Sequence, residues 1–207
     1  TSNLGISDQP DAAIDGNDNI HLVWRQDYNP DLADSNLDTT LDKNPSGAIF
    51  YSRWNGQNWS RENRNISVID KQGARQPAVA VGVDRLPAVV WSGLNGSLRE
   101  IRFSRFDGRN WSTPVSISSG IDSSYSAVAP DIAVDKITGN LYVVWQGGDG
   151  PYTYFREYYG NSWTPAKRVS SNGGTQPRIV TGYDGSIYIT WVATNGTNVR
   201  FARYMGN

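Results

Sequence analysis

The sequence has 207 residues, of which 38% are hydrophobic and 12% aromatic, so it contains enough apolar material for a folded core. Its 19 basic and 20 acidic residues give a net charge of -1 with no dense basic run, which argues against nucleic acid as a partner. No apolar stretch approaches the roughly 20 residues that cross a bilayer, so we expect no membrane span. The lack of cysteine excludes disulfides, thiolate metal sites and a cysteine nucleophile.

Four segments of the chain share one pattern. Each starts at a proline, continues through two β-rich runs around a Gly, Asp or Asn turn, and ends at a tryptophan, which is typical of a β-hairpin. A third β-rich run and a second turn follow each hairpin, and in the first three repeats a fourth run comes after them. The four hairpins occupy residues 10–24, 77–91, 130–145 and 177–191.

A repeat of roughly 50 residues with four antiparallel strands is typical of one β-propeller blade, which buries both faces only when neighbours stack on it. We therefore predict an all-β, four-bladed β-propeller that forms a single domain over residues 1–207. The predicted blades cover about 8–70, 71–120, 121–173, and 174–207 together with 1–7.

The ends of the chain bear on how such a ring would close. Residues 1–7 align with residues 112–118, the fourth run of the second repeat, whereas the last repeat ends after its third run. We expect the N-terminal strand to complete the last blade, which would close the ring and cover exposed strand edges. A fragment of a longer array and two copies that assemble into a larger ring are the alternatives. We thus expect a monomer, with a dimer as the other possibility.

The repeat resembles the sialidase-like propeller repeats known as BNR or Asp-box repeats, over the full chain. The resemblance rests on Tyr-Ser-Arg or Phe-Ser-Arg, then Gly-x-x-Trp-Ser, then Ile-Ser. The box tryptophan recurs at Trp59, Trp111 and Trp163, but its aspartate is replaced, so the boxes are degenerate. The resemblance implies a propeller in which the box glycine permits a tight turn and the tryptophan packs between blades. The residues that replace the box aspartate are Trp54, Phe106 and Tyr158.

The catalytic apparatus of that family does not carry over to this sequence. Sialidases of the superfamily use three arginines, a tyrosine–glutamate pair and an aspartate on five or six blades. The three glutamates match no such context, and the recurring arginines are interpreted as stacking or salt-bridging along the third strands, with a ligand-binding set as the alternative. We predict no catalytic residue, and His21 is expected to be structural or solvent-facing. The glutamates are Glu62, Glu100 and Glu157, and the arginines are Arg53, Arg105 and Arg203, with Glu157 at that position in the third blade.

Candidate ligand residues lie where we expect the loop face around the central channel. The first blade carries an insertion from Gln26 to about Gly47, whose Asp31, Asp34 and Asp38 could bind calcium through oxygen; a solvated polar loop is the alternative. Glutamines precede three of the hairpins and a tryptophan ends each, but interblade hydrogen bonds and interblade core are alternative roles. The predicted ligand-binding residues are Gln9, Gln76, Gln176, Trp24, Trp91, Trp145, Trp191, Tyr28 and Gln146.

These observations predict a non-catalytic, lectin-like module that binds carbohydrate through its loop face and requires no cofactor. A structural propeller with a protein ligand is one alternative. A sialidase-like or other glycoside hydrolase is the enzymatic alternative, since a glycosidase needs only two suitably spaced carboxylates. We expect an extracellular or secreted protein, a location that the lack of cysteine leaves open.

Overall fold

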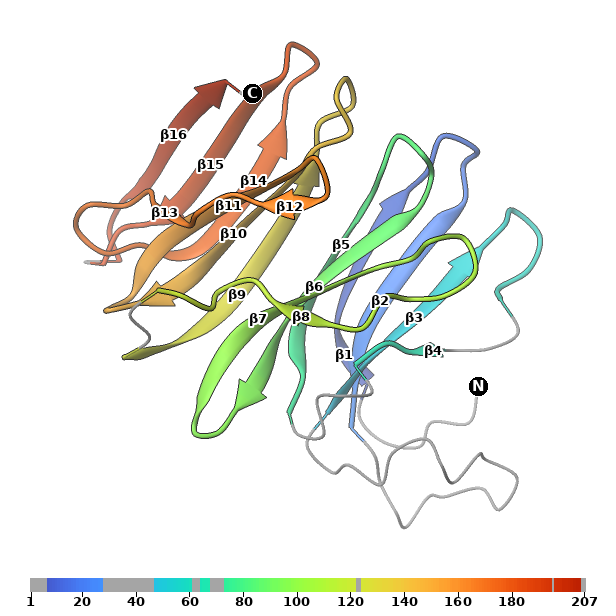
Figure 1. The fold of residues 1–207 in the computed structure, drawn as a ribbon, viewed down its shortest axis with the longest axis horizontal. Coiled ribbons are helices and arrows are strands. Elements are labelled where there is room, and N and C mark those ends of the chain that lie inside the picture. Colours follow the sequence, from blue (N-terminus) through green and yellow to red (C-terminus); the bar gives the residue numbers. More distant parts are fainter. Residues whose placement is uncertain are drawn as a thin grey trace.

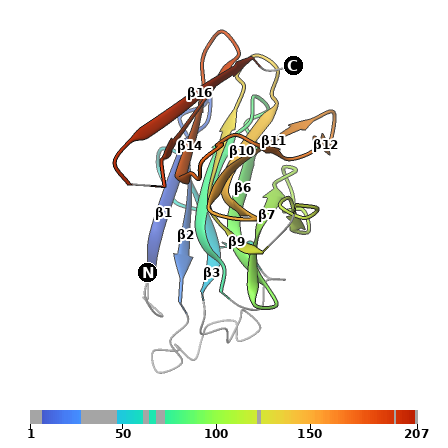
Figure 2. The same ribbon diagram turned by 90° about the vertical axis from the view of Figure 1, so that its left-hand side faces the viewer.

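The computed structural model describes residues 7–27, 47–60, 64–67, 73–121, 124–194 and 196–205. Regular structure in these ranges is all β-strand, arranged as four antiparallel sheets in chain order (Figures 1 and 2). In this part of the chain no helix is long and apolar enough to cross a membrane.

In each sheet consecutive strands pair, except that β13 of the third sheet pairs with β11 instead of β12. The first sheet contains β1 (Ser7–Ile14), β2 (Ile20–Gln26), β3 (Ala48–Trp54) and β4 (Arg64–Asn65). The second contains β5 (Arg75–Val81), β6 (Pro87–Asn95), β7 (Leu98–Arg105) and β8 (Val115–Ser116). The third contains β9 (Tyr125–Val134), β10 (Leu141–Gly148), β11 (Tyr152–Tyr159), β12 (Ser162–Trp163) and β13 (Lys167–Arg168). The described strands of the fourth are β14 (Thr175–Thr181), β15 (Ser186–Val192) and β16 (Val199–Met205).

Aspartate side chains shape the hairpin turns that the sequence predicts. In the turn between β1 and β2, Asp15 Oδ1 accepts hydrogen bonds from the backbone N–H groups of Asn17 (2.7 Å) and Asn19 (3.0 Å). Asp135 accepts in the same way from Ile137 N–H (2.7 Å) in the third sheet. Such local bonds satisfy backbone donors that the strands leave unpaired, which is why aspartate favours these turns.

The first strand of every sheet is irregular at the residue before the repeat proline. Gln9, Gln76, Ala129 and Gln176 all have positive φ angles between 50° and 54°, and the pairing register shifts beside each of them. Positive φ is uncommon outside glycine, so four occurrences at one repeat position mark a shared β-bulge. Such a bulge bends the strand locally and increases its twist.

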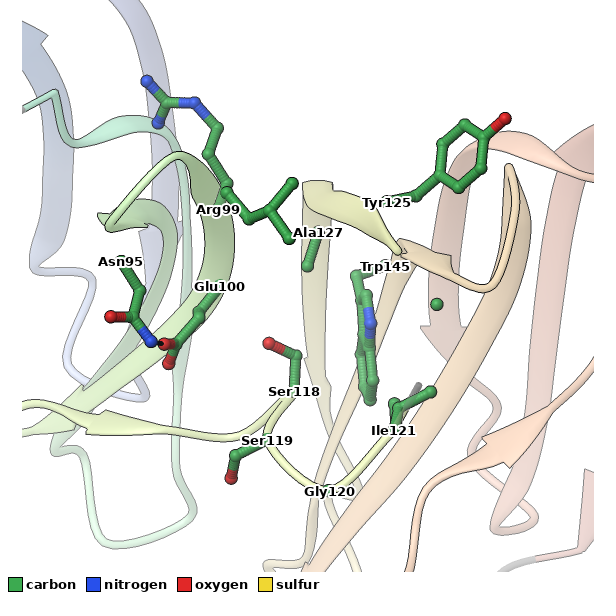
Figure 3. A pocket seen from close by; sticks show the side chains of 12 residues that line it. Asn95, Arg99, Glu100, Ser118, Ser119, Gly120, Ile121, Tyr125, Ala127 and Trp145 are labelled. Atoms are coloured by element: carbon green, nitrogen blue, oxygen red, sulfur yellow. Dashed lines mark hydrogen bonds between the residues drawn. The ribbon is translucent and has the colours of Figure 1, made fainter. Parts of the chain in front are cut away.

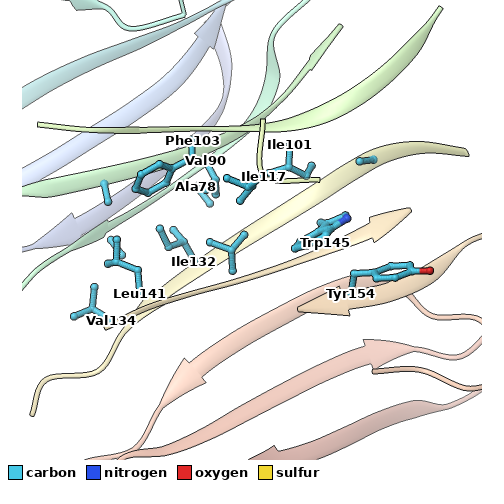
Figure 4. Close-up of a cluster of buried hydrophobic side chains, with 14 residues drawn as sticks. Ala78, Val90, Ile101, Phe103, Ile117, Ile132, Val134, Leu141, Trp145 and Tyr154 are labelled. Carbon is cyan, nitrogen blue, oxygen red and sulfur yellow. The ribbon is translucent and has the colours of Figure 1, made fainter. Parts of the chain in front are cut away.

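Three hydrophobic clusters hold consecutive sheets together. The cluster between the second and third sheets is shown in Figure 4, where Phe103 and Ile101 of β7 face Ile132 of β9 and Leu141 of β10. An aromatic residue on the third strand of each of the first three sheets also meets the next sheet. At the first two junctions its partner is the box tryptophan, in edge-to-face pairs with ring centroids 5.0 Å apart, which confirms the predicted interblade packing there. These pairs are Tyr51 with Trp111 and Phe103 with Trp163.

The four sheets follow one another along an arc, from β1–β4 at one end to β14–β16 at the other (Figure 1). Within the described residues no strand of the first sheet pairs with a strand of the fourth. Of the segment predicted to close the ring, residues 1–6 lie outside the described ranges, and Ser7 belongs to β1, opposite Gln26. Closure of a four-bladed ring therefore stays a prediction.

Candidate functional site

A cavity of about 250 Å³ lies between the second and third sheets (Figure 3). Its walls come from the turn between β6 and β7, from the segment after β8, and from the start of β9 and the end of β10. These connections belong to the face where the sequence predicts ligand contacts. The lining residues are Asn95, Leu98, Arg99, Glu100, Ser118, Ser119, Gly120, Ile121, Tyr125, Ala127, Trp145 and Gly148.

Trp145 of β10 forms the aromatic wall of this cavity. Its side chain is fully buried and stacks on Tyr154 of β11, with ring centroids 5.9 Å apart and planes 18° apart. The buried indole nitrogen Nε1 has no hydrogen-bond partner. Leaving a buried N–H unpaired costs free energy, so an oxygen atom that reached this donor would gain a hydrogen bond. Figure 3 shows the ring standing beside Ile121, with the Tyr125 side chain pointing away from it.

The opposite wall is polar. Asn95 Nδ2 donates to Glu100 Oε1, which ties the turn after β6 to the start of β7. The other carboxylate oxygen of Glu100 lies 3.6 Å from Arg102 Nη1. Ser118 Oγ accepts from Ile101 N–H (2.9 Å), so its hydroxyl position is fixed by the backbone. In Figure 3 the Glu100 and Asn95 side chains point toward each other and away from the Trp145 ring, while Ser118 lies between them and the ring. The lining thus combines a carboxylate, an amide, a hydroxyl and an indole, a donor and acceptor set that suits polyhydroxylated ligands.

Arg99 lies at the rim and anchors the site to the neighbouring segment. Its Nη1 donates to the carbonyl oxygens of Gly73 (2.6 Å) and Ser92 (3.1 Å). Burial, together with the nearby charges of Arg75 and Arg25, lowers the pKa of Arg99 to about 10. Arg25, Arg75 and Arg99 therefore concentrate positive charge in this part of the first two sheets.

Two carboxylates partly neutralise that charge. Arg25 of β2 makes ion pairs with Asp8 (2.9 Å) and Asp27 (2.5 Å). Apart from Trp145, the sequence analysis identified neither this group nor the cavity residues, because it followed positions that recur from repeat to repeat. The sequence signal for the cavity residues was the lack of repetition, since Arg99 and Glu100 each occur at their position in one repeat only.

The predicted glutamines form contacts between sheets. Gln9 Oε1 accepts from Gln76 N–H (2.6 Å), and Gln76 Oε1 accepts from Ala129 N–H (3.0 Å). These are the interblade backbone hydrogen bonds that the sequence left as an alternative to ligand binding. Gln176 occupies the equivalent place in the fourth sheet and is exposed.

The four predicted tryptophans lie in different environments, and only Trp145 lines the cavity. Trp91 is fully buried between the first and second sheets, and Trp191 packs against the core between the third and fourth. Trp24 is half-buried, stacks on Phe50 at 5.8 Å, and donates from Nε1 to Gln26 Oε1 (3.2 Å). Gln146, next to Trp145, is half-buried and pairs opposite Thr153.

The predicted metal ligands cannot be placed. Asp31, Asp34 and Asp38 lie outside the described residues, so the calcium site stays a prediction. Tyr28, predicted to contact a ligand, also lies outside them. Among the described residues no group of three His, Asp or Glu side chains could hold a metal ion.

The recurring charged position on the third strands makes contacts within its own sheet. Arg105 pairs with Asp84 (2.6 Å) and Arg203 with Asp184 (3.1 Å), both in the hairpin turn of the same sheet. Glu157 instead accepts from Asn140 Nδ2 (3.2 Å). Arg53, the fourth member, is exposed on β3. These side chains brace hairpins and lie away from the cavity.

No family model and no curated protein matches the sequence. Solved structures do match, with 13% to 16% identity. A protein of unknown function from Dyadobacter fermentans has a TM-score of 0.72 over 98% of this chain and 66% of that chain. The Hadza microbial sialidase Hz136 has a TM-score of 0.66 over 96% of this chain and 44% of that chain. A Penicillium chrysogenum α-L-arabinanase complexed with arabinobiose has a TM-score of 0.61 over 96% of this chain and 61% of that chain.

This chain therefore spans less than two thirds of the length of these three proteins. Sialidases and arabinanases are β-propellers, so the likeness shows a propeller-like fold. The Asp-box resemblance itself stays a prediction.

Proposed function

We propose that this protein is a carbohydrate-binding β-propeller module that holds a sugar in the cavity between the second and third sheets. The observation that supports this most directly is the buried, unpaired N–H of Trp145 in a cavity whose other wall carries Glu100 and Asn95. The sialidase and the arabinanase complexed with arabinobiose, both similar in fold, make carbohydrate the first ligand class to test.

The cavity chemistry suits a sugar ring. A sugar hydroxyl can accept from Trp145 Nε1 while another donates to the Glu100 carboxylate, and the apolar face of the ring can pack against Tyr125 and Ile121. At about 250 Å³ the cavity is smaller than typical small-molecule pockets of roughly 300–1,000 Å³. We therefore infer that it takes one sugar unit, such as the end of a chain.

Calorimetric titration of the folded protein with arabinobiose and with a sialylated trisaccharide tests this proposal. Trp145→Phe keeps an aromatic ring but removes the N–H, so binding should weaken by about 2- to 10-fold, the value of one hydrogen bond. Trp91→Phe is the matched control, because Trp91 occupies the same repeat position but does not line the cavity. Equal effects of the two substitutions would contradict the site.

A glycoside hydrolase is the second candidate, favoured by two aspartates on the first strands. Asp11 of β1 and Asp131 of β9 occupy the same repeat position, each directly after the repeat proline. Burial raises the pKa of Asp131 to about 6, and the charge of Asp11 contributes to that rise. One protonated and one ionised carboxylate are what a glycosidase needs.

Both aspartates, however, already accept backbone hydrogen bonds of 2.8 Å from the next sheet, Asp11 from Val79 and Asp131 from Ile179. We therefore rank binding first. Release of sugar from arabinobiose or from a fluorogenic sialoside, lost in Asp131→Asn, would reverse that order.

A further inference from the structure

The two end sheets of the arc each leave one face exposed, and these faces match the two sides of the internal junctions. On the fourth sheet, Phe201 of β16 is 73% exposed. Its counterparts one, two and three repeats earlier are buried against the following sheet. These counterparts are Phe155, Phe103 and Tyr51.

The strand pairing shows which side chains share this face with Phe201. Phe201 lies opposite Thr190, and Arg203 opposite Tyr188, which in turn lies opposite Val180. Directly opposed residues of antiparallel strands point to the same side of a sheet, and residues two apart on one strand do so as well. Val180, Val199 and Met205 therefore lie on the side of Phe201, and all three are exposed. Tyr204 points the other way and stacks on Phe155 of the third sheet.

The first sheet exposes the complementary side. Trp59 is 46% exposed, whereas Trp111 and Trp163, its counterparts in the next two repeats, are half-buried against the preceding sheet. Ile14 of β1 is also exposed, but its counterpart Val81 is buried. The first sheet therefore exposes the same residue positions that, in the second and third sheets, pack against the sheet before them.

We propose that a second copy of this chain covers these faces, with the fourth sheet of one copy docked on the first sheet of the other. The contact would repeat the internal junctions, with Phe201 edge-to-face against Trp59 as Tyr51 is against Trp111 and Phe103 against Trp163. Within one chain the two faces lie at opposite ends of the arc (Figure 1). Two copies related by a two-fold axis satisfy both faces at once, since every copy carries both.

Cysteine cross-linking tests the contact, because the chain has no cysteine of its own. Phe201→Cys and Trp59→Cys are made as separate proteins, mixed, and oxidised mildly. We expect a disulfide-linked pair with twice the mass of one chain. Tyr183→Cys is the matched control: it is highly exposed but lies in the turn between β14 and β15, so with Trp59→Cys it should give no such pair.

Two measurements can overturn the proposal. Light scattering should give the mass of two chains for the unmodified protein, and Phe201→Glu should return it to one chain with unchanged far-ultraviolet circular dichroism. A mass of one chain at all accessible concentrations would refute the contact. So would an intrachain disulfide in a monomeric Phe201→Cys, Trp59→Cys double variant, which would show instead that each chain closes on itself.

Discussion

His21 of β2 lies between Tyr51 of β3 and Asp15 of the first hairpin turn. Its Nδ1 is 2.9 Å from the Tyr51 hydroxyl, and its Nε2 is 3.4 Å from Asp15 Oδ2. All three side chains are buried. Burial lowers the pKa of His21 below its ordinary value of 6.5, although Asp15 opposes the shift. We infer a neutral ring whose Nε2–H donates to Asp15 and whose Nδ1 accepts from Tyr51.

This arrangement predicts a loss of stability in mild acid. Because the folded state binds the His21 proton less readily than the unfolded chain, its contribution is complete above pH 6.5 and is lost as the pH falls below that value. We expect the urea midpoint of the wild type, relative to that of His21→Phe, to fall between pH 7 and pH 5. The relative measure is needed because other buried groups titrate nearby. Parallel curves for the two proteins would contradict the prediction.

Asp131 should make the folded protein less stable as the pH rises, which is opposite to the effect of His21. Its pKa is raised to about 6, chiefly by burial, so its contribution is complete below pH 3.8 and is lost as the pH rises through 6. Asp131→Asn keeps an acceptor for Ile179 N–H without a buried charge, and it should gain roughly 1 to 2 kcal/mol over wild type at pH 8.

The control for Asp131→Asn is Asp131→Ala, which also removes the charge but leaves Ile179 N–H without its partner. That variant should be less stable than Asp131→Asn at every pH. Chemical denaturation at pH 4 and pH 8 measures both differences. A gain for Asp131→Asn at pH 4 that equals the gain at pH 8 would show that charge burial is not its source.

Gln76 should contribute to stability through the junction of the second and third sheets. Its side chain accepts from Ala129 N–H, and its own N–H donates to Gln9, so Gln76→Ala leaves the Ala129 donor without its partner. The expected loss is about 1 kcal/mol in the free energy of unfolding. Gln57→Ala, at an exposed turn after β3, is the control and should change little. Equal losses would mean that the interblade bond adds nothing.

The sequence predicts the strands well because their signals are local. The repeat prolines and turn aspartates define the hairpins, although the second strands run past the tryptophans predicted to end them, as β6 does to Asn95. Ile117–Ser118 shows why Ile-Ser recurs, because Ser118 Oγ accepts from Ile101 N–H of the adjacent third strand. Ser67 and Ser170 make the same bond with Ile49 and Thr153. Because the same hydrogen bond forms in three sheets, the serine that makes it recurs in three repeats, and this repetition can be recognised within a single sequence.

The candidate site was harder to predict because its residues do not repeat. Glu100 and Asn95 look like ordinary polar residues of a turn, and their place in a cavity lining depends on the third sheet, which contributes Trp145 to the same cavity. Trp145 itself was predicted as one of four equivalent tryptophans. Only the structure separates it from Trp91, because only the Trp145 side chain borders a cavity with its nitrogen unpaired. Gln9 and Gln76 show the reverse case, in which repetition reflects scaffold contacts.

A glycan-array screen of the wild type beside Glu100→Gln tests the central claim, sugar binding in the cavity, most directly. Glu100→Gln keeps the size of the side chain but removes the carboxylate of the cavity lining. We predict a defined set of bound glycans sharing one terminal sugar, with signals that fall several-fold in the variant, since hydrogen bonds to charged groups contribute about 1.5–3 kcal/mol. A folded wild-type protein that binds no glycan, or that binds the same glycans equally well in both forms, would contradict the claim.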